Sequence, residues 1–343
     1  MTGRPRQRDI AKLAGVSQTA VSLVLNGRTA EHGINRATEQ RILAAIRELG
    51  YVPDVTAQAL RRGRNGLIGV HTYEPLFPTS KDSYYDEFMV GIEQQATRSG
   101  QDLVLFTSVH QTAGDQSVYR GGQNRLRLAD GAVILGFQQR DDELERLAAE
   151  GFVFVYIGRR EKAASLMPYV TADYRAAVTD VIDRAHRLGH RRVAYLGMPD
   201  QAEPRTERRE AFHESCAANG IAIADETFTG GGRLDRAWLD RVTGGGATLL
   251  LTERTAHLDA VAAVCDEAQV LIPQALSVIG LDATDYRPQA SSREWTHITV
   301  PRRAIGVRAV ELLLEVLDGA HPLSYHELLP CGFEPGATLA ARR

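Results

Sequence analysis

One stretch near the N-terminus, Asp9 to Asn26, restricts the fold of this 343-residue chain more than any other segment. Its apolar residues suit two short helices packed together. Gly15 favours the left-handed conformation that ends a helix, and Ser17 is suited to cap the next one. The outer face of that second helix carries the short polar side chains Gln18, Thr19 and Ser22. Such a helix fits the major groove of DNA, so the pattern predicts a helix-turn-helix; an ordinary helical hairpin is the alternative.

The charge distribution supports a nucleic-acid partner for this end of the chain. Residues 1–64 hold 11 Lys and Arg but only 5 Asp and Glu, so their net charge is +6. The whole chain carries −3, which leaves −9 for the remainder. A basic head on an acidic body is typical of a DNA-binding module joined to a domain of another kind. A solvated basic face is the alternative.

Composition excludes several other classes of protein. The apolar fraction of 43% and the charged fraction of 24% are ordinary for a folded globular chain. The three cysteines, Cys216, Cys265 and Cys331, lack metal-ligand or redox spacing, so we expect free thiols in the reducing cytoplasm. We find neither a signal-peptide pattern nor a stretch of about 20 apolar residues, and expect no membrane contact.

Beyond the head, the pattern changes twice. A third helix, capped by Asn35, is expected to end at Gly50, and a basic, glycine-punctuated segment follows. From Leu67 onward, apolar runs alternate with amphipathic segments, which predicts parallel sheets with helical crossovers in two similar lobes. The expected strands are 67–71, 102–107, 130–135, 152–157, 169–171, 192–196, 247–251 and 276–279, and the expected helices are 86–99, 141–150, 175–188, 207–219 and 258–268.

A series of motifs runs in order along nearly the whole chain. It includes Asp9 to Ser17, Leu49 to Pro53, Asp130 to Leu135, Leu188 to Gly197 and Ser277 to Asp282. No one motif is decisive, but the full series resembles the lactose-repressor (LacI/GalR) family of bacterial transcription regulators. The resemblance implies an α/β fold class: an N-terminal all-α helix-turn-helix domain and a two-lobed body with parallel sheets, like a periplasmic binding protein.

The resemblance also implies a domain plan and an assembly. We place the helix-turn-helix domain at 1–53, the hinge helix and linker at 54–65, the first lobe at 66–164 with 292–322, and the second lobe at 165–291 with 323–343. The partner is double-stranded operator DNA, bound by a homodimer or a dimer of dimers with one head on each half-site. No leucine-heptad tail follows Gly336 to Ala340, which favours the dimer.

Base reading is assigned to the second helix of the head. Gln18, Thr19 and Ser22 are the expected readers, and Ser17 and Asn26 lie beside them. Leu23 is apolar, so it suits a thymine methyl group and cannot pair with guanine through two hydrogen bonds. The resemblance makes Ala57, Leu60 and Arg61 part of a hinge helix in the minor groove, with Leu60 as a wedge between base steps and Arg61 on phosphate; an ordinary linker residue is the alternative for Leu60.

The resemblance places a small-molecule effector between the lobes. The polar candidates are Asp173, Arg208, Glu253 and Asp282, whose carboxylate and guanidinium groups suit the vicinal hydroxyls of a sugar. The aromatic candidates are Tyr84 and Tyr85, which could stack on a pyranose ring, and Trp295 near a lobe crossing. Helix capping or mutual pairing is the alternative for the polar residues, and core packing is the alternative for Trp295.

These observations favour a DNA-binding regulator, a repressor of sugar-utilisation genes whose operator affinity an effector controls. A nucleobase is the alternative effector, and a sugar-binding transport protein is the alternative class. The sequence lacks a nucleophile elbow, a phosphate-binding loop and a His-Glu-x-x-His motif, so we expect no enzyme, no cofactor and no metal. The sequence does not decide whether the effector releases or promotes DNA binding.

Overall fold

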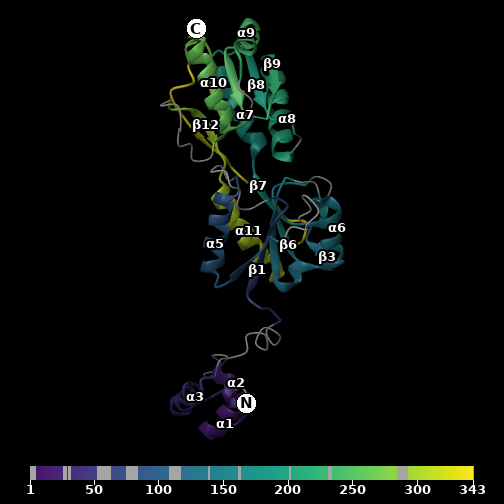
Figure 1. The fold of residues 1–343 in the computed structure, drawn as a ribbon, viewed down its shortest axis with the longest axis vertical. Helices are drawn as coiled ribbons and strands as arrows, with labels where there is room; N and C mark the ends of the chain where they lie inside the picture. Colours follow the sequence, from purple (N-terminus) through teal and green to yellow (C-terminus); the bar gives the residue numbers. More distant parts are fainter. Residues whose placement is uncertain are drawn as a thin grey trace. The chain divides into compact units, whose positions relative to one another are not determined.

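The chain forms two compact units in a computed structural model, Met1–Asn65 and Gly66–Arg343 (Figure 1). The structure describes residues 5–25, 29, 32–51, 63–74, 84–107, 117–137, 140–160, 164–200, 202–230, 234–283 and 293–342. The hinge segment expected at 54–61 lies outside these ranges. We call the first unit the head and the second the body.

The head contains the three expected helices, and local signals define their ends. They are α1 (Gln7–Ala14), α2 (Gln18–Leu25) and α3 (Arg36–Glu48). Gly15 ends α1 with φ of 64°, as the left-handed turn requires. The Ser17 hydroxyl accepts a hydrogen bond from the Ala20 amide at 3.1 Å, and Asn35 caps α3 by accepting from the Thr38 amide at 2.8 Å. One buried side chain from each helix, Ile10, Val21 and Ile42, is fully inaccessible to solvent.

The body consists of two lobes, each built on a six-stranded sheet. The first lobe holds β1 (Leu67–Thr72), α5 (Asp86–Arg98), β2 (Asp102–Phe106), β3 (Tyr119–Arg120), β4 (Gln123–Asn124), η1 (Arg125–Leu128), β5 (Gly131–Leu135), α6 (Asp141–Ala149), β6 (Phe154–Ile157), η2 (Ala164–Leu166), β7 (Tyr169–Ala172), α11 (Arg302–Leu317) and β13 (His326–Leu329). The second lobe holds α7 (Tyr174–Arg187), β8 (Arg192–Gly197), α8 (Glu203–Ala218), β9 (Ala222–Phe228), α9 (Arg236–Gly244), β10 (Leu249–Thr252), α10 (Thr255–Glu267), β11 (Ser277–Ala283), β12 (Thr296–Thr299) and β14 (Gly332–Glu334).

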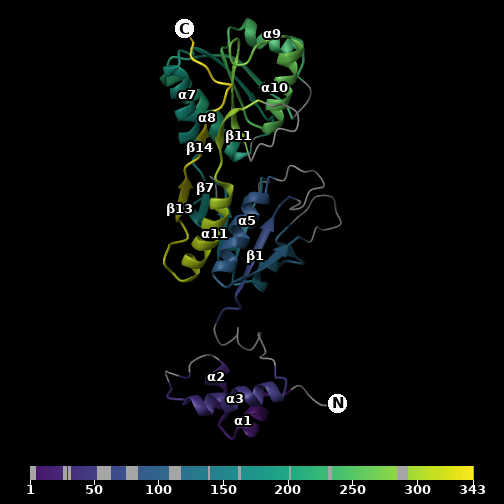
Figure 2. The ribbon, with the colours of Figure 1, turned by 90° about the vertical axis from the view of Figure 1, so that its left-hand side faces the viewer.

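Helices cover both faces of each sheet, as parallel sheets require. The strand order is β13-β7-β6-β5-β1-β2 in the first lobe and β14-β12-β11-β10-β8-β9 in the second. Among these strands, only β14 runs antiparallel to its neighbour. In the second lobe, α7 and α8 pack on one face and α9 and α10 on the other (Figure 2). Alternate residues of β8 divide between the two cores: Ala194 and Leu196 face α9 and α10, whereas Val193 and Tyr195 face α7 and α8.

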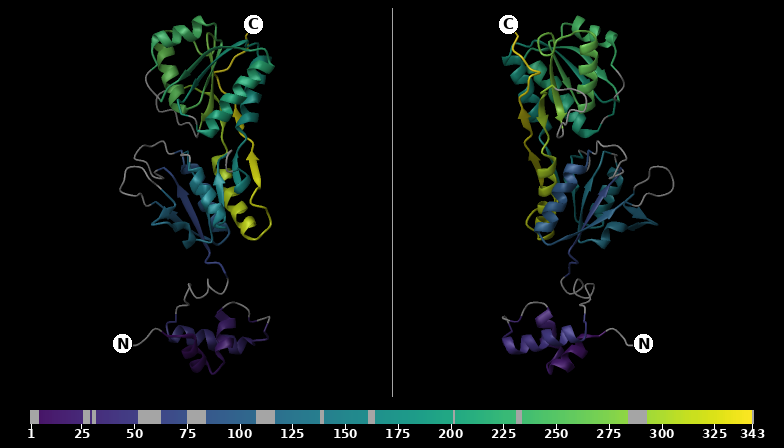
Figure 3. Two further views of the ribbon diagram at one scale, coloured as in Figure 1. Left: turned by 90° about the vertical axis from the view of Figure 1, so that its right-hand side faces the viewer. Right: turned by 60° about the vertical axis from the view of Figure 1, so that its left-hand side comes forward.

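The chain passes between the lobes three times: after β7, between β12 and α11, and between β13 and β14. The C-terminal strands β13 and β14 follow one another along one edge of the body (Figure 3). Each crossing lies later than we expected, because β7, β12 and β13 pair within the lobe that the chain is leaving. Residues 165–172 and 323–329 therefore belong to the first lobe, and residues 296–299 to the second. Pairing is non-local, so a strand pattern does not reveal which sheet the strand joins.

Glycine allows α5 and α11 to pack with their backbones in contact. A Cβ atom added to Gly91 of α5 would lie 2.1 Å from the carbonyl oxygen of Arg303. One added to Gly306 of α11 would lie 2.2 Å from the carbonyl oxygen of Phe88. Neither space can be made by rotating a side chain, because the obstructing atoms are backbone. The two helices can therefore occupy these positions only with glycine at both contacts.

We predict that Gly306→Ala destabilises the body by at least about 1–3 kcal/mol, because the added methyl group forces α5 and α11 apart. Urea unfolding followed by circular dichroism measures the change. Gly244→Ala is the matched control, since a Cβ there meets no atom within 4 Å. Equal unfolding midpoints for the two variants would contradict the close helix contact.

Candidate functional site

The base-reading residues expected on α2 lie on its solvent-accessible side. Ser17, Gln18 and Thr19 are exposed, and Ser22 is half-buried, while Val21 and Val24 face the core of the head. Among the described residues of the head, seven basic side chains are also exposed: Arg6, Arg8, Lys12, Arg36, Arg41, Arg47 and Arg64. The head therefore presents a solvent-accessible polar helix face together with exposed positive charges, which suits DNA. Asn26, Ala57, Leu60 and Arg61 lie outside the residues that the structure describes.

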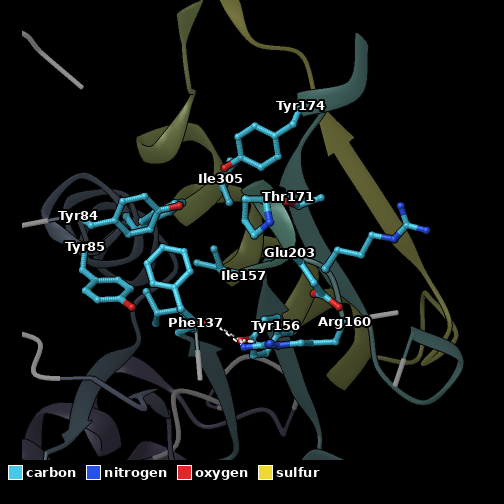
Figure 4. Close-up of a pocket in the computed structure, with 16 residues that line it drawn as sticks. Tyr84, Tyr85, Phe137, Tyr156, Ile157, Arg160, Thr171, Tyr174, Glu203 and Ile305 are labelled. Carbon is cyan, nitrogen blue, oxygen red and sulfur yellow. Dashed lines mark hydrogen bonds between the residues drawn. The ribbon is translucent and has the colours of Figure 1, made fainter. Parts of the chain in front are cut away.

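The body contains a pocket lined mainly by residues of the first lobe, five of them aromatic (Figure 4). Tyr84, Tyr85 and Phe137 gather on one side, opposite Tyr156, Arg160 and Glu203. Its full lining is Tyr84, Tyr85, Phe88, Leu135, Gly136, Phe137, Tyr156, Ile157, Gly158, Arg159, Arg160, Thr171, Tyr174, Glu203, Pro204 and Ile305. The pocket lies beyond the carboxyl ends of β5 and β6, where parallel sheets bind ligands.

We call the side of the pocket formed by Tyr84, Tyr85 and Phe137 the aromatic wall, and Glu74 holds it in place. Its carboxylate accepts a hydrogen bond from the Tyr85 hydroxyl at 2.6 Å and another from the Phe137 amide at 2.9 Å. Burial raises the pKa of Tyr85, and the adjacent Glu74 charge raises it further. Tyr85 therefore remains a neutral phenol that donates a hydrogen bond to Glu74, and this bond fixes the orientation of its ring.

A second polar anchor lies across the pocket. The Tyr156 hydroxyl donates to the Gly136 carbonyl oxygen at 2.6 Å. Arg160 donates to that hydroxyl at 2.7 Å and to the same carbonyl at 2.9 Å. Arg160 is 3% exposed, so its guanidinium is a fixed donor group and not a mobile surface charge.

Asp282, at the end of β11, is bound by two buried arginines. Arg208 of α8 donates to its Oδ2 at 3.2 Å, and Arg302 of α11 donates to its Oδ1. The side chains of Arg208 and Arg302 are 4% and 2% exposed. Burial alone would raise the pKa of Asp282, but the two guanidinium groups hold it below the ordinary value. The carboxylate is therefore ionised and links the two lobes.

The remaining candidates have structural partners. Asp173 caps α7 by accepting from the Ala176 amide at 2.9 Å. Glu253 is 2% exposed and accepts from the Tyr195 hydroxyl and the Met198 amide, both at 2.6 Å. Trp295 is 4% exposed in the core of the second lobe and does not line the pocket. For Trp295 the sequence allowed either the effector site or the core. The structure places it in the core, and the sequence could not decide because the residues around it come from distant parts of the chain.

Sequence reasoning missed several residues of the site. Phe137, Tyr156, Arg160 and Glu203 line the pocket, and Arg302 binds Asp282. Phe137 and Arg160 follow directly after buried strands, and position at the carboxyl end of a strand is the signal that could have found them. Arg302 offered no such signal, because its partner is 20 residues away in the other lobe.

The architecture defines a class of protein: a helix-turn-helix head on a two-lobed body of the periplasmic-binding type. Models described as bacterial regulatory proteins of the lacI family, and as periplasmic binding proteins and sugar-binding domain of the LacI family, match residues 8–54 and 72–230. A model of a periplasmic binding protein-like domain matches residues 182–339. The chain belongs to the LacI family of bacterial regulatory proteins. It is a DNA-binding transcriptional regulator and not an enzyme, so the family and fold read from the sequence are confirmed.

Individual relatives agree along the full length. The transcriptional regulator CelR of Thermobifida fusca is 27% identical over 92% of this chain and 93% of its own. A lac repressor dimer bound to operator and an anti-inducer superposes with a TM-score of 0.75 at 20% identity, covering 99% of this chain and 100% of that one. A CelR–cellobiose complex gives a TM-score of 0.62 at 22% identity, covering 98% and 100%. At these identities the two structures establish the shared fold.

The described residues also bear on the expectations about metal ions, membrane spans and cysteines. Within them, no group of three His, Cys, Asp or Glu side chains is placed to hold a metal ion. Nor does any helix there have the length and apolar character needed to span a bilayer. The three cysteines are free thiols, and burial raises the pKa of Cys216 to about 12.

We predict that Glu74→Ala destabilises the first lobe by about 1–3 kcal/mol, because the half-buried Phe137 amide and the Tyr85 hydroxyl lose their acceptor. Chemical unfolding of the purified protein measures the loss. Glu93→Ala, an exposed carboxylate on α5, is the matched control and is expected to change stability by less than about 0.5 kcal/mol. Equal stability of both variants would show that Glu74 does not hold the wall.

Proposed function

We propose that this protein is a repressor of sugar-utilisation genes whose affinity for its operator is set by a sugar bound in the body. The observation that supports it best is the aromatic pocket beside a buried group of carboxylates and guanidinium groups. Aromatic faces pack against the apolar side of a pyranose ring, while carboxylates and arginines pair with its hydroxyls. Tyr84 and Tyr85 provide the faces, and Asp282 and Arg208 provide the polar partners.

The relatives suggest a first sugar to test. CelR, whose solved complex contains cellobiose, covers nearly the full length of this chain. A disaccharide could place one ring against the aromatic wall and the hydroxyls of the other near Asp282. Asp173 and Glu253 border this region from the second lobe, where each now serves a structural hydrogen bond. Trp295 is left out of the effector site because it belongs to a core.

A nucleobase is the second candidate for the effector. The specific observation in its favour is the number of aromatic rings around the pocket, since a flat base stacks on the same surfaces. The two candidate effectors differ in the number of hydrogen-bonding groups that they need from the protein. A sugar needs acceptors and donors for several hydroxyls, whereas a base needs only a few groups along its edge.

For the DNA, we infer that two heads of a homodimer read the half-sites of a two-fold-symmetric operator. Gln18, Thr19 and Ser22 contact base edges, and Ser17 lies at the start of the same helix. From the sequence alone, Asn26, Ala57, Leu60 and Arg61 are assigned to DNA as well, with Leu60 as the minor-groove wedge. Effector binding changes operator affinity through the body, by a coupling of about 1–3 kcal/mol.

The experiment that tests this function measures binding of the full chain to the DNA upstream of its own gene. Fluorescence anisotropy at fixed ionic strength gives the dissociation constant with and without cellobiose, maltose, sucrose or hypoxanthine. We expect one of the sugars to change operator affinity roughly 5- to 150-fold. A response to hypoxanthine alone would replace the sugar with a base. Absence of sequence-selective binding would overturn the proposed function.

We predict that Gln18→Ala lowers specific operator affinity roughly 5- to 150-fold, because one side-chain contact to a base edge supplies about 1–3 kcal/mol of discrimination. Binding to unrelated DNA should change little, since that binding depends on phosphate contacts. Gln40→Ala on α3, also an exposed glutamine, is the control and should leave both affinities unchanged. Equal loss on both DNAs would remove Gln18 from base reading.

A further inference from the structure

Arg302 is hydrogen-bonded to Asp282, the carboxylate that the proposed effector would bind. Asp282 has two oxygen atoms, and each already accepts from an arginine: Oδ2 from Arg208 and Oδ1 from Arg302. Each oxygen could accept a second hydrogen bond, but the Asp282 side chain is only 15% exposed and the two guanidinium groups that cover it are 4% and 2% exposed. A sugar that reaches this buried carboxylate therefore displaces one of the arginines. Arg208 belongs to the same lobe as Asp282, whereas Arg302 belongs to the other lobe.

The position of Arg302 contradicts local preference. It is the first residue of α11, where the helix dipole disfavours a positive charge. Its side chain is 2% exposed, and its Nε has no hydrogen-bond partner among the described residues. A cation at a helix N-terminus, buried and with one donor unsatisfied, is a local cost that packing alone does not require. Exceptions of this kind are expected at functional positions.

Contacts on both sides of the Arg302 guanidinium join the pocket to Asp282. Its central carbon lies 4.6 Å from the centre of the Tyr84 ring and 6.0 Å from that of Phe88. Both rings line the aromatic pocket of the first lobe. The same guanidinium binds Asp282 of the second lobe. Arg302 thus stands between the aromatic wall and the polar partner, where a sugar spanning the two would lie.

The charges of this region remain paired without Arg302. Arg208 keeps Asp282 as its partner and stacks on Tyr174 at 4.3 Å. Glu253, the other carboxylate that affects Arg208, is held by hydrogen bonds within its own lobe. Release of Arg302 therefore breaks a link between the lobes and leaves the rest of the second-lobe group intact.

We propose that Arg302 is an internal ligand of Asp282, which competes with the effector and holds the two lobes together until the effector replaces it. The inference rests on the proposed function for the identity of the competitor. Arg302 donates one N–H to Asp282, and a hydroxyl group of a sugar can donate to the same oxygen in its place. The effector can bind only those molecules in which Arg302 has left Asp282. Arg302 therefore raises the effector concentration needed for a response.

The first test measures cellobiose binding to the full-length protein by isothermal titration calorimetry. Arg302→Met keeps the apolar stem against Tyr84 and removes the donor, so we expect the dissociation constant to fall about tenfold. Arg302→Lys keeps the charge but lacks the planar guanidinium that lies over the Tyr84 ring, and its dissociation constant should lie between the two. Arg303→Met, on the exposed neighbour that bonds Gln94, should match the wild type. Weaker or unchanged binding by Arg302→Met would overturn the competition.

The second test needs no effector. Hydrogen–deuterium exchange of the full chain without added sugar compares the wild type with Arg302→Met and Arg303→Met. Loss of the link should speed exchange at the start of α11, at the start of α5 and at the end of β11, and leave the helices of the head unchanged. Unchanged exchange in Arg302→Met would show that Arg302 does not hold the lobes. If cellobiose binds neither protein, cellobiose is not the effector, and exchange still decides whether Arg302 joins the lobes.

Discussion

The backbone contact between α5 and α11 determines the position of the aromatic wall relative to Arg302. Tyr84 and Tyr85 immediately precede α5, and Arg302 begins α11. A close helix pair without side chains at its crossing leaves little freedom to slide, because ordinary packing distances are set by the side chains between helices. Glycine at both contacts therefore fixes the aromatic wall and the bridging arginine with respect to each other. The chemistry of the pocket depends on a contact that contains no functional group.

The buried charges of Asp282, Arg208 and Arg302 are stable only when they are paired with one another. An isolated buried carboxylate or guanidinium is strongly disfavoured, and removing one member of a buried pair costs far more than the pair contributes. Asp282 meets this requirement with Arg208 and Arg302, and the pKa of Asp282 stays below its ordinary value despite burial. The effector that we propose for this site would have to supply equivalent hydrogen bonds, which favours a ligand with several hydroxyls over one that is flat and apolar.

Local chemistry made the head predictable, and non-local pairing limited the prediction of the body. The left-handed Gly15 and the caps at Ser17 and Asn35 depend on neighbours within four residues, so the sequence contained them. The alternation of strands and helices gave the fold class. It did not give β9, β12, β13 or β14, because short or half-buried strands near a sheet edge carry weak patterns. Arg302 was missed for the same reason as the lobe crossings: its partner is defined only after two sheets have formed.

Separate cores constrain how the two units communicate. The core of the head uses only residues of its own three helices and the segments beside them, so a change in the body need not alter the fold of the head. We propose that the body controls the positions that the heads can reach, while the heads themselves stay folded. A link such as that between Arg302 and Asp282 is suited to this task, because it changes how one lobe is held against the other without unfolding either. In the homodimer that we propose, the two heads would then bind an operator tightly only in the arrangement that both half-sites accept.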